Sequence, residues 1–204
     1  MTIENPQRDA LASFNFAQKY ARYLPEHKRR ETWSEATSRV MSMHRTKLGE
    51  RAEELSVELE EIELLINQRR ILGSQRSLQF GGDAVLAKHA RSYNCTSCYV
   101  DHVDRFAQAL YLLLCGAGVG YSVQKHHVAK LPPILDADTL ADKERVDRCI
   151  PDTIEGWADA FKGLVRSYTD PVTPLFTFDF SMIREKGAPI SSCGGKAPGP
   201  EPLR

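Results

Sequence analysis

The sequence SYNCTSCYVDHVDRFAQALYLLLCGAGVGYSV, at residues 92–123, decides which fold we expect. Its first part leads into a short strand that ends near Val100. Apolar residues at helical spacing then predict a helix that stops at Gly116, and apolar residues that alternate from Val119 to Val123 predict another strand. The order strand, helix, strand is the signature of a parallel α/β unit. The stretch therefore predicts an α/β fold.

The glycine-rich segment from Gly116 to Gly120 has three possible explanations. A dinucleotide-binding fingerprint has the wrong context, because that motif follows a strand and opens a helix, whereas here a helix precedes and a strand follows. The other two explanations are a helix cap joined to a tight turn, and glycines that let the backbone approach a ligand. Periodicity alone does not separate these two.

The residues before this stretch predict helices. Thr32-Trp33-Ser34-Glu35 is a capping box, which marks the start of a helix. A second helix is predicted from apolar residues at helical spacing, namely Leu55, Leu59, Ile62 and Ile66. Residues 72–82 hold too many small and polar side chains for a regular helix. They predict a loop or a short extended piece.

The residues after the stretch predict loops, one helix and one strand. Residues 131–151 are loop-rich and resemble an insertion. Asp152 can cap a helix over residues 154–168, and apolar residues at 176–180 alternate with polar ones as in a strand. Residues 187–204 are rich in Gly and Pro and stop without a closing element. This ending suggests a truncated chain.

The composition argues against several classes of protein. The chain of 204 residues has 27 basic and 27 acidic side chains, whereas general nucleic-acid binders cluster Lys and Arg to hold phosphates. No apolar stretch approaches the roughly 20 residues of a membrane span, so we expect no membrane association. No signal peptide is visible. Five cysteines without an export signal indicate reduced thiols and a cytoplasmic location.

Cys95 and Cys98 form a possible redox or zinc pair. A structural zinc site needs about four ligands, and because no second cysteine pair exists we expect no metal site. On an extended strand the two side chains point to opposite faces, which disfavours a disulfide between them. Spacing alone leaves open a functional thiol and a small buried hydrophobic residue. Cys115 and Cys149 are expected to be packing residues.

Several longer segments carry a resemblance to a known family, and they are Tyr20–Pro25, Arg30–Trp33, Arg76–Gly82, Ala90–Cys95, Gly118–Val128, Ile154–Ala160, Gly187–Ile190 and Gly194–Pro200. They resemble the monomeric, adenosylcobalamin-dependent (class II) ribonucleotide reductases, which reduce ribonucleoside triphosphates. The likeness follows one order from about residue 14 to the end of the chain, and several long motifs in one order are far more specific than a single short one.

The resemblance implies a domain organisation. An N-terminal helical region, residues 1–71, would precede the first part of a ten-stranded α/β barrel of the ribonucleotide reductase type, residues 72–204. An insertion at about residues 128–174 would substitute for a dimer partner. Because chains of the family are several times longer, the resemblance also implies that this chain is the N-terminal part of such an enzyme.

The resemblance also implies the site residues. In the family, cleavage of the cobalt–carbon bond of adenosylcobalamin generates a cysteine thiyl radical that takes the 3′ hydrogen of the ribose, and two further cysteines become a disulfide. Cys95 matches the first cysteine of this redox-active pair. Ser74, Asn94 and Gly118 match positions that contact the substrate, and Asp101 falls where the allosteric effector is bound. The radical cysteine, the second reducing cysteine and most cofactor contacts are expected in the C-terminal part.

The sequence departs from the family pattern at four positions. Proline and methionine are expected where Gly73 and Gln75 stand, so the substrate loop is less rigid than in the family. Cys98 and Cys193 are not cysteines of the pattern, and we assign neither of them a role.

The expected function is therefore ribonucleotide reduction, in deoxyribonucleotide synthesis for DNA replication, by an enzyme that needs a C-terminal complementary polypeptide for activity. A ribonucleotide substrate, a deoxynucleotide effector and a dithiol such as thioredoxin are the other expected partners. One alternative is a non-catalytic nucleotide-binding or assembly module derived from the same fold. Another is a thiol- or zinc-binding domain. An intact Cys95 favours the enzyme, because a binding module needs no thiol there.

Overall fold

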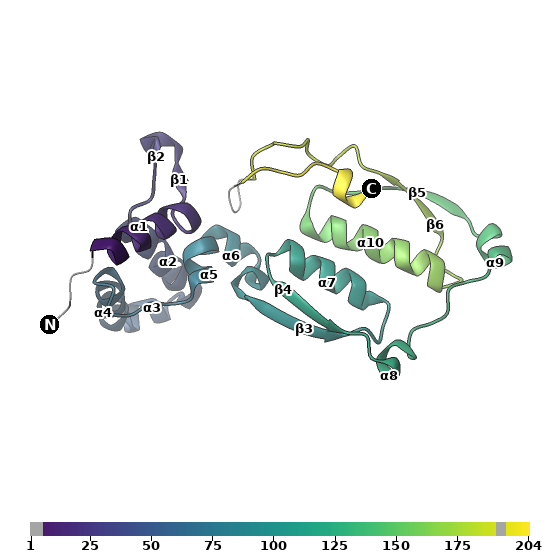
Figure 1. Ribbon diagram of the computed structural model, residues 1–204, viewed down its shortest axis with the longest axis horizontal. Coiled ribbons are helices and arrows are strands. Elements are labelled where there is room, and N and C mark those ends of the chain that lie inside the picture. Colours follow the sequence, from purple (N-terminus) through teal and green to yellow (C-terminus); the bar gives the residue numbers. More distant parts are fainter. Residues whose placement is uncertain (1–5, 191–194) are drawn as a thin grey trace. The chain divides into compact units, whose positions relative to one another are not determined.

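The computed structural model describes residues 6–190 and 195–204. These residues form two compact units (Figure 1), the first up to Ser92 and the second from Tyr93 through the rest of the described chain. Helices dominate the first unit, and the second combines helices with parallel strands. The boundary that the sequence suggested, after residue 71, falls within the first unit.

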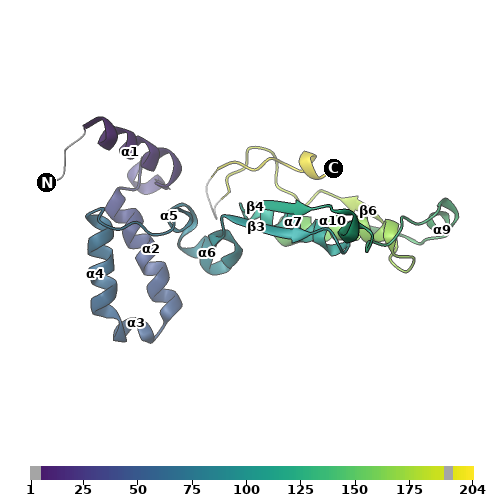
Figure 2. The same ribbon diagram turned by 60° about the horizontal axis from the view of Figure 1, so that its bottom comes forward.

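The first unit is built from short and medium helices. Its elements are α1 (Pro6–Lys19), β1 (Tyr23–Leu24), η1 (Pro25–His27), β2 (Arg29–Arg30), α2 (Trp33–Leu48), α3 (Arg51–Glu54), α4 (Ser56–Asn67), α5 (Gln75–Phe80), α6 (Asp83–Ala87) and η2 (His89–Ser92). The strands β1 and β2 form a short antiparallel pair. Figure 2 shows α2 and α4 packed as a hairpin that α3 connects. The predicted N-terminal helices are confirmed.

The helix α2 begins where the capping box predicts. The side-chain oxygen of Thr32 accepts a hydrogen bond from the backbone N–H of Glu35, and the carboxylate of Glu35 accepts one from the N–H of Thr32. This reciprocal cap satisfies donors that the first turn of a helix leaves unpaired. The apolar core of the unit comprises Val40, Met43, Leu78, Phe80 and Val85.

Residues 75–80 form the helix α5, where the sequence suggested a loop. The expectation of a loop or extended piece is wrong for these residues. A helix of six residues does not hold itself together in water, so its stability comes from tertiary contacts. Leu78 and Phe80 supply these contacts, because both side chains are buried in the core of the unit.

The second unit alternates strands and helices. Its elements are β3 (Cys95–Tyr99), α7 (Asp104–Leu114), β4 (Gly118–Ser122), α8 (Lys125–Val128), α9 (Ala137–Ala141), β5 (Arg145–Cys149), α10 (Ile154–Thr169), β6 (Leu175–Asp179) and η3 (Glu201–Leu203). The strands β3 and β4 pair in parallel, and so do β5 and β6. The helices α7 and α10 connect the strands of each pair and pack against each other (Figure 1).

The α/β class is thereby confirmed. The described residues form two strand–helix–strand units rather than a closed barrel. The first unit of this kind is the one that residues 92–123 predict. The second contains the predicted strand at 176–180, which the structure places at β6.

The end of α7 is the one that the sequence predicts, whereas the cap at the start of α10 is not. The helix α7 ends before Gly116, whose φ of 95° is a left-handed conformation that favours glycine, as the sequence predicts. The helix α10 begins after Thr153, whose side chain accepts a hydrogen bond from the N–H of Gly156 at 2.9 Å. The prediction of Asp152 as the cap is wrong, because its carboxylate pairs with Arg184 at 2.5 Å instead.

The segment 131–151 is more regular than the sequence suggested. It contains α9 and β5, so the expectation of loops is wrong for these residues. The guanidinium of Arg148 on β5 lies 5.2 Å from the ring centre of Phe176 on β6, a cation–π contact that joins the two strands. The expected insertion at about 128–174 thus includes β5 and α10, which belong to the second strand–helix–strand unit.

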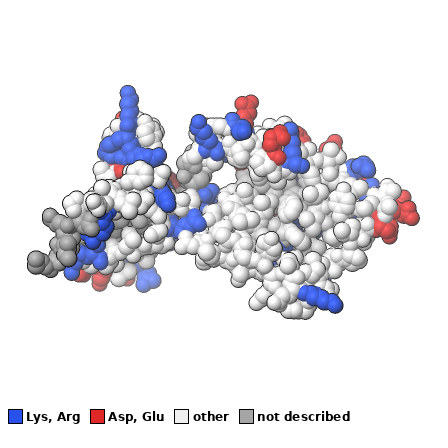
Figure 3. Space-filling model, in the orientation of Figure 1, with Lys and Arg blue, Asp and Glu red and all other residues white. Residues whose placement is uncertain are grey.

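On the face drawn in Figure 3, Lys and Arg side chains recur over the first unit, whereas the second unit is less charged. On the second unit, charged side chains lie toward the margins of this face and most of the area between them is uncharged. None of the described helices is both long enough and apolar enough to cross a membrane.

Candidate functional site

The strand β3 has two different faces. Cys95, Ser97 and Tyr99 are exposed on one face, whereas the residues between them are partly covered. The covered face is the one toward α7, since Cys98 lines an apolar cavity of about 500 Å³ together with Phe106 of that helix. Cys95 and Cys98 therefore point to opposite sides, as the sequence predicts for a strand.

Cys95, Asn94 and Gly118 lie together where β3 and β4 begin. Cys95 is the register partner of Gly118, and the N–H of Gly118 donates a hydrogen bond to the carbonyl of Asn94 at 2.8 Å. A Cβ on Gly118 would lie 3.9 Å from the Sγ of Cys95 and 3.7 Å from the same carbonyl. The glycine thus leaves the space beside an exposed, free thiol open.

The conformation of the glycines shows which of them the turn requires. The turn after α7 uses Gly116, which has a positive φ. Gly118 and Gly120 lie within β4 and do not have a positive φ, so the backbone does not require glycine at either position. The turn after α7 therefore accounts for Gly116 but not for Gly118 or Gly120.

Ser74 lies in the first unit, whereas Cys95, Asn94 and Gly118 lie in the second. It precedes α5, and its side chain makes no capping hydrogen bond to that helix. Ser74 also lines an apolar cavity of about 470 Å³ between α2, α4 and the segment that leads into α5. Its hydroxyl is therefore not used to start the helix, although serine is a common cap.

Asp101 follows β3, close to a polar cluster at the carboxyl ends of β3 and β4. Its carboxylate lies 3.4 Å from the guanidinium of Arg105. The rings of Tyr99 and His127 are in contact, with centres 4.4 Å apart and planes tilted by 38°, and Nδ1 of His127 lies 3.1 Å from Oγ of Ser122. In open α/β sheets, the crevice at the carboxyl ends of the parallel strands is a common ligand site. Tyr99, Ser122 and His127 were not predicted as site residues, although the polar residues directly after the alternating strand at 119–123 indicate a site there.

The pKa of His127 is lowered from its usual value. Partial desolvation is the largest cause, and the nearby His126 and Lys130 lower the pKa further. Asp101 acts in the opposite direction. The neutral imidazole is therefore the favoured form near neutral pH, and it can accept a hydrogen bond at one ring nitrogen and donate at the other.

The remaining cysteines have different surroundings. Cys115 is fully buried, so the prediction of a packing residue is confirmed. The same prediction is wrong for Cys149, which is exposed on β5 beside its register partner Asp179. Cys193 lies outside the described residues. Among those that are described, there is no group of three or more His, Cys, Asp or Glu residues that could hold a metal ion.

Comparison with known proteins gives consistent results. No family model matches the chain. It is 27% identical to the adenosylcobalamin-dependent ribonucleoside-triphosphate reductase of Lacticaseibacillus paracasei and 26% identical to that of Levilactobacillus brevis, with 97% of the chain and 35% of each relative covered. A crystal structure of a B12-dependent (class II) ribonucleotide reductase matches with a TM-score of 0.77 at 24% identity, over 93% of this chain and 35% of that one.

These relatives are much longer than the present protein. The chain spans about a third of the length of the curated relatives it matches, and the match covers nearly all of its own residues. The resemblance recognised from the sequence is confirmed: the chain is similar in sequence, and in the fold of its described residues, to about a third of an adenosylcobalamin-dependent ribonucleoside-triphosphate reductase.

Proposed function

We propose that this chain is the N-terminal part of a ribonucleotide reductase that converts ribonucleoside triphosphates to deoxyribonucleotides. The observation that carries this proposal is the exposed thiol of Cys95 beside the open space at Gly118. A thiol that reduces a substrate must be reached by that substrate and afterwards by a dithiol that restores it. An exposed position on a strand meets both needs.

Cys95 acts in this proposal as one of two reducing thiols. The 2′ hydroxyl of the ribose leaves as water, and the two electrons for this reduction come from two thiols that are oxidised to one disulfide. The second thiol belongs to the part of the enzyme outside this chain. A dithiol protein such as thioredoxin then exchanges with the disulfide and restores both thiols.

In this proposal the other residues that the resemblance implies supply the nucleotide contacts. The backbone at Gly118, with Asn94 beside it, approaches the ribose, and Ser74 of the first unit contributes a hydroxyl to the substrate. The effector nucleotide binds near Asp101 at the carboxyl ends of β3 and β4. The polar atoms of Tyr99, Ser122 and His127 in the same place support this assignment.

The relatives are named as adenosylcobalamin-dependent. When bound, this cofactor supplies the radical that starts the reduction. The described residues of this chain include no set that identifies its binding site, and Cys95 faces the substrate in this proposal rather than the cofactor. We therefore assign the cofactor contacts to the complementary polypeptide that carries the rest of the relatives' length.

A reconstitution experiment tests the proposal. The purified chain is mixed with a complementary C-terminal reductase polypeptide, adenosylcobalamin, a dithiol and labelled ribonucleoside triphosphate, and the deoxynucleotide product is measured. We expect product from the mixture and none from the chain alone. Absence of product from the mixture, with both polypeptides folded and associated, would favour a non-catalytic nucleotide-binding or assembly module.

A further inference from the structure

The helix α5 follows Ser74 and is held at both ends by side chains of residues 20–39. At its start, the hydroxyl of Tyr20 donates a hydrogen bond to Oε1 of Gln75 at 2.9 Å. At its end, the guanidinium of Arg39 donates to the carbonyls of Leu78 and Gly81 at 2.9 and 2.8 Å. The hydrogen bonds within α5 hold its helical form but do not fix its position. The polar contacts at its two ends fix that position.

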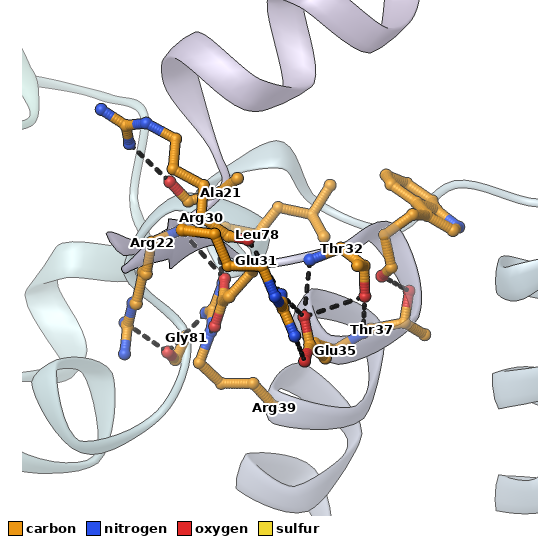
Figure 4. A network of polar contacts seen from close by, with 12 residues as sticks. Ala21, Arg22, Arg30, Glu31, Thr32, Glu35, Thr37, Arg39, Leu78 and Gly81 are labelled. Carbon is orange, nitrogen blue, oxygen red and sulfur yellow. Dashed lines mark hydrogen bonds and ion pairs between the residues drawn. The ribbon is translucent and has the colours of Figure 1, made fainter. Parts of the chain in front are cut away.

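Arg39 is itself held by a buried carboxylate (Figure 4). Its Nε and Nη2 donate to the two carboxylate oxygens of Glu31 at 2.7 and 2.8 Å, in the paired geometry that guanidinium and carboxylate favour. The Glu31 and Arg39 side chains are 6% and 14% exposed, so water screens the pair weakly. Glu31 also accepts from the N–H of Arg22, which fixes the carboxylate to the backbone.

A second guanidinium converges on the same carbonyl. Arg22 donates to the oxygen of Gly81, so this acceptor is shared with Arg39. The glycines allow the convergence: a Cβ on Gly81 would lie 2.2 Å from the carbonyl oxygen of Ser77, and Gly82 has a φ of 102°. The chain therefore turns away from α5 at Gly81, whose carbonyl accepts hydrogen bonds from both arginines.

The contacts continue through α5 to Ser74. The N–H of Leu78 donates to the carbonyl of Ser74 at 3.3 Å, and Arg39 binds the carbonyl of that same Leu78. One residue, Leu78, therefore links the guanidinium to the backbone of Ser74. All of these residues belong to the first unit.

We propose that Arg39, oriented by Glu31, is a positioning residue that fixes the substrate-contacting segment from Ser74 through α5. This inference rests on the proposed function, which assigns Ser74 to the substrate. It adds the contacts that hold the segment of Ser74 in place. Gly73, directly before Ser74, gives this segment little intrinsic rigidity. The clamp of Arg39 and Tyr20 supplies the rigidity from outside the segment.

The variant Arg39→Lys tests the device, with Arg29→Lys as the matched control. Lysine keeps the charge that Glu31 needs but cannot reproduce the planar fork that reaches a carboxylate and two carbonyls together. Arg29 also makes a paired contact, to Glu35 at 2.7 Å, but it is exposed and no hydrogen bond joins it to α5. Hydrogen exchange of the full chain should be faster at residues 75–82 in Arg39→Lys and unchanged in the control.

Kinetics of the reconstituted enzyme provide the second measurement. Arg39→Lys should raise the KM for the ribonucleoside triphosphate by about tenfold, because a displaced segment binds the substrate less well. A purely structural role would lower the number of active molecules, and hence kcat, at an unchanged KM. The variant Tyr20→Phe removes one hydroxyl at the other end of α5. It should raise KM about threefold and lower the free energy of unfolding by no more than about 1 kcal/mol, because the lost hydrogen bond is exposed.

The outcomes separate this inference from the proposed function. Equal exchange at residues 75–82 in both lysine variants, or a lower kcat at unchanged KM in Arg39→Lys, overturns the positioning role and leaves the reductase proposal intact. A reconstituted enzyme with native Arg39 that makes no deoxynucleotide overturns the reductase proposal instead. Faster exchange together with a higher KM supports both.

Discussion

Cys95 and Cys98 lie on one strand, yet their side chains have different surroundings. Cys95 is exposed beside Gly118, whereas Cys98 faces an apolar cavity under α7. In the reconstituted enzyme, Cys95→Ser should abolish dithiol-driven turnover, because serine cannot form a disulfide. Cys98→Ser should retain most of the activity. Equal losses in the two variants, measured as deoxynucleotide formed, would show that the thiols act as a pair.

Gly118 offers a test of the space beside the thiol. In Gly118→Ala the new methyl group would lie 3.9 Å from the sulfur of Cys95, an ordinary contact, so folding stability should change by less than about 0.5 kcal/mol. The same methyl group occupies the space through which a ribose would approach, so kcat/KM should fall by at least about tenfold. Gly120→Ala is the control, since its methyl group would face the carbonyl of Thr96 instead. Equal kcat/KM values for both variants would contradict the assignment.

His127 makes the stability of the chain depend on pH. Its pKa is lowered in the folded state, mainly by desolvation and then by His126 and Lys130, so the unfolded state binds a proton more readily. The contribution to stability is complete above the usual pKa of 6.5 and is lost as pH falls through the folded value. Between about pH 7.5 and pH 5.5, His127→Gln should therefore lose less stability than the native chain. Denaturant midpoints at both pH values provide the measurement, and parallel losses would refute the expectation.

At the scale of elements, the start of α10 gives the clearest prediction. Thr153→Ala removes the side-chain oxygen that accepts from Gly156, so the free energy of unfolding should fall by about 1 kcal/mol. Asp152→Ala removes a partly exposed ion pair with Arg184 and should cost less than about 0.5 kcal/mol. Denaturation curves compare the two variants. A larger loss of unfolding free energy in Asp152→Ala would show that Asp152, rather than Thr153, caps α10.

The strand β5 and the helix α5 were not predicted from the sequence, and the physical reason is the same for both. The strand β5 has polar residues on both faces, so no alternation of apolar side chains marks it, and its strand form depends on pairing with β6. The helix α5 likewise depends on Arg39 and on a core assembled from distant residues. By contrast, the capping box at Thr32 and the cap at Gly116 act locally, and the sequence predicted both.

At the scale of the whole molecule, the composition leads to a prediction about nucleic acids. Net charge is zero, with 27 basic and 27 acidic residues, so long-range attraction to a phosphate backbone is weak. Binding of the chain to duplex DNA at physiological salt should be weaker than about 10⁻⁴ M, the weak end of non-specific binding. A mobility-shift titration measures this. A shift at micromolar protein would reveal a basic surface whose role lies beyond the proposed function.

The sequence predicted only part of the candidate site. The parallel unit of residues 92–123 implied that β3 and β4 are neighbours, but only the register brings Cys95 beside Gly118. Cys149 is exposed and Cys115 is buried, and the spacing of residues in the sequence does not predict this difference. The roles of Ser74, Asn94 and Asp101, and the organisation of residues 72–204 as the first part of a barrel, remain predictions.

The pairing of β3 with β4, the next strand in the chain, has a consequence for biosynthesis. Contacts between segments close in sequence form quickly, because little chain entropy is lost in closing the short connection. A ribosome adds about 5–20 residues per second, so β3, α7 and β4 can associate soon after Ser122 leaves the exit tunnel. The thiol of Cys95 is then in position while the residues from α8 to the end of this chain have yet to emerge from the tunnel.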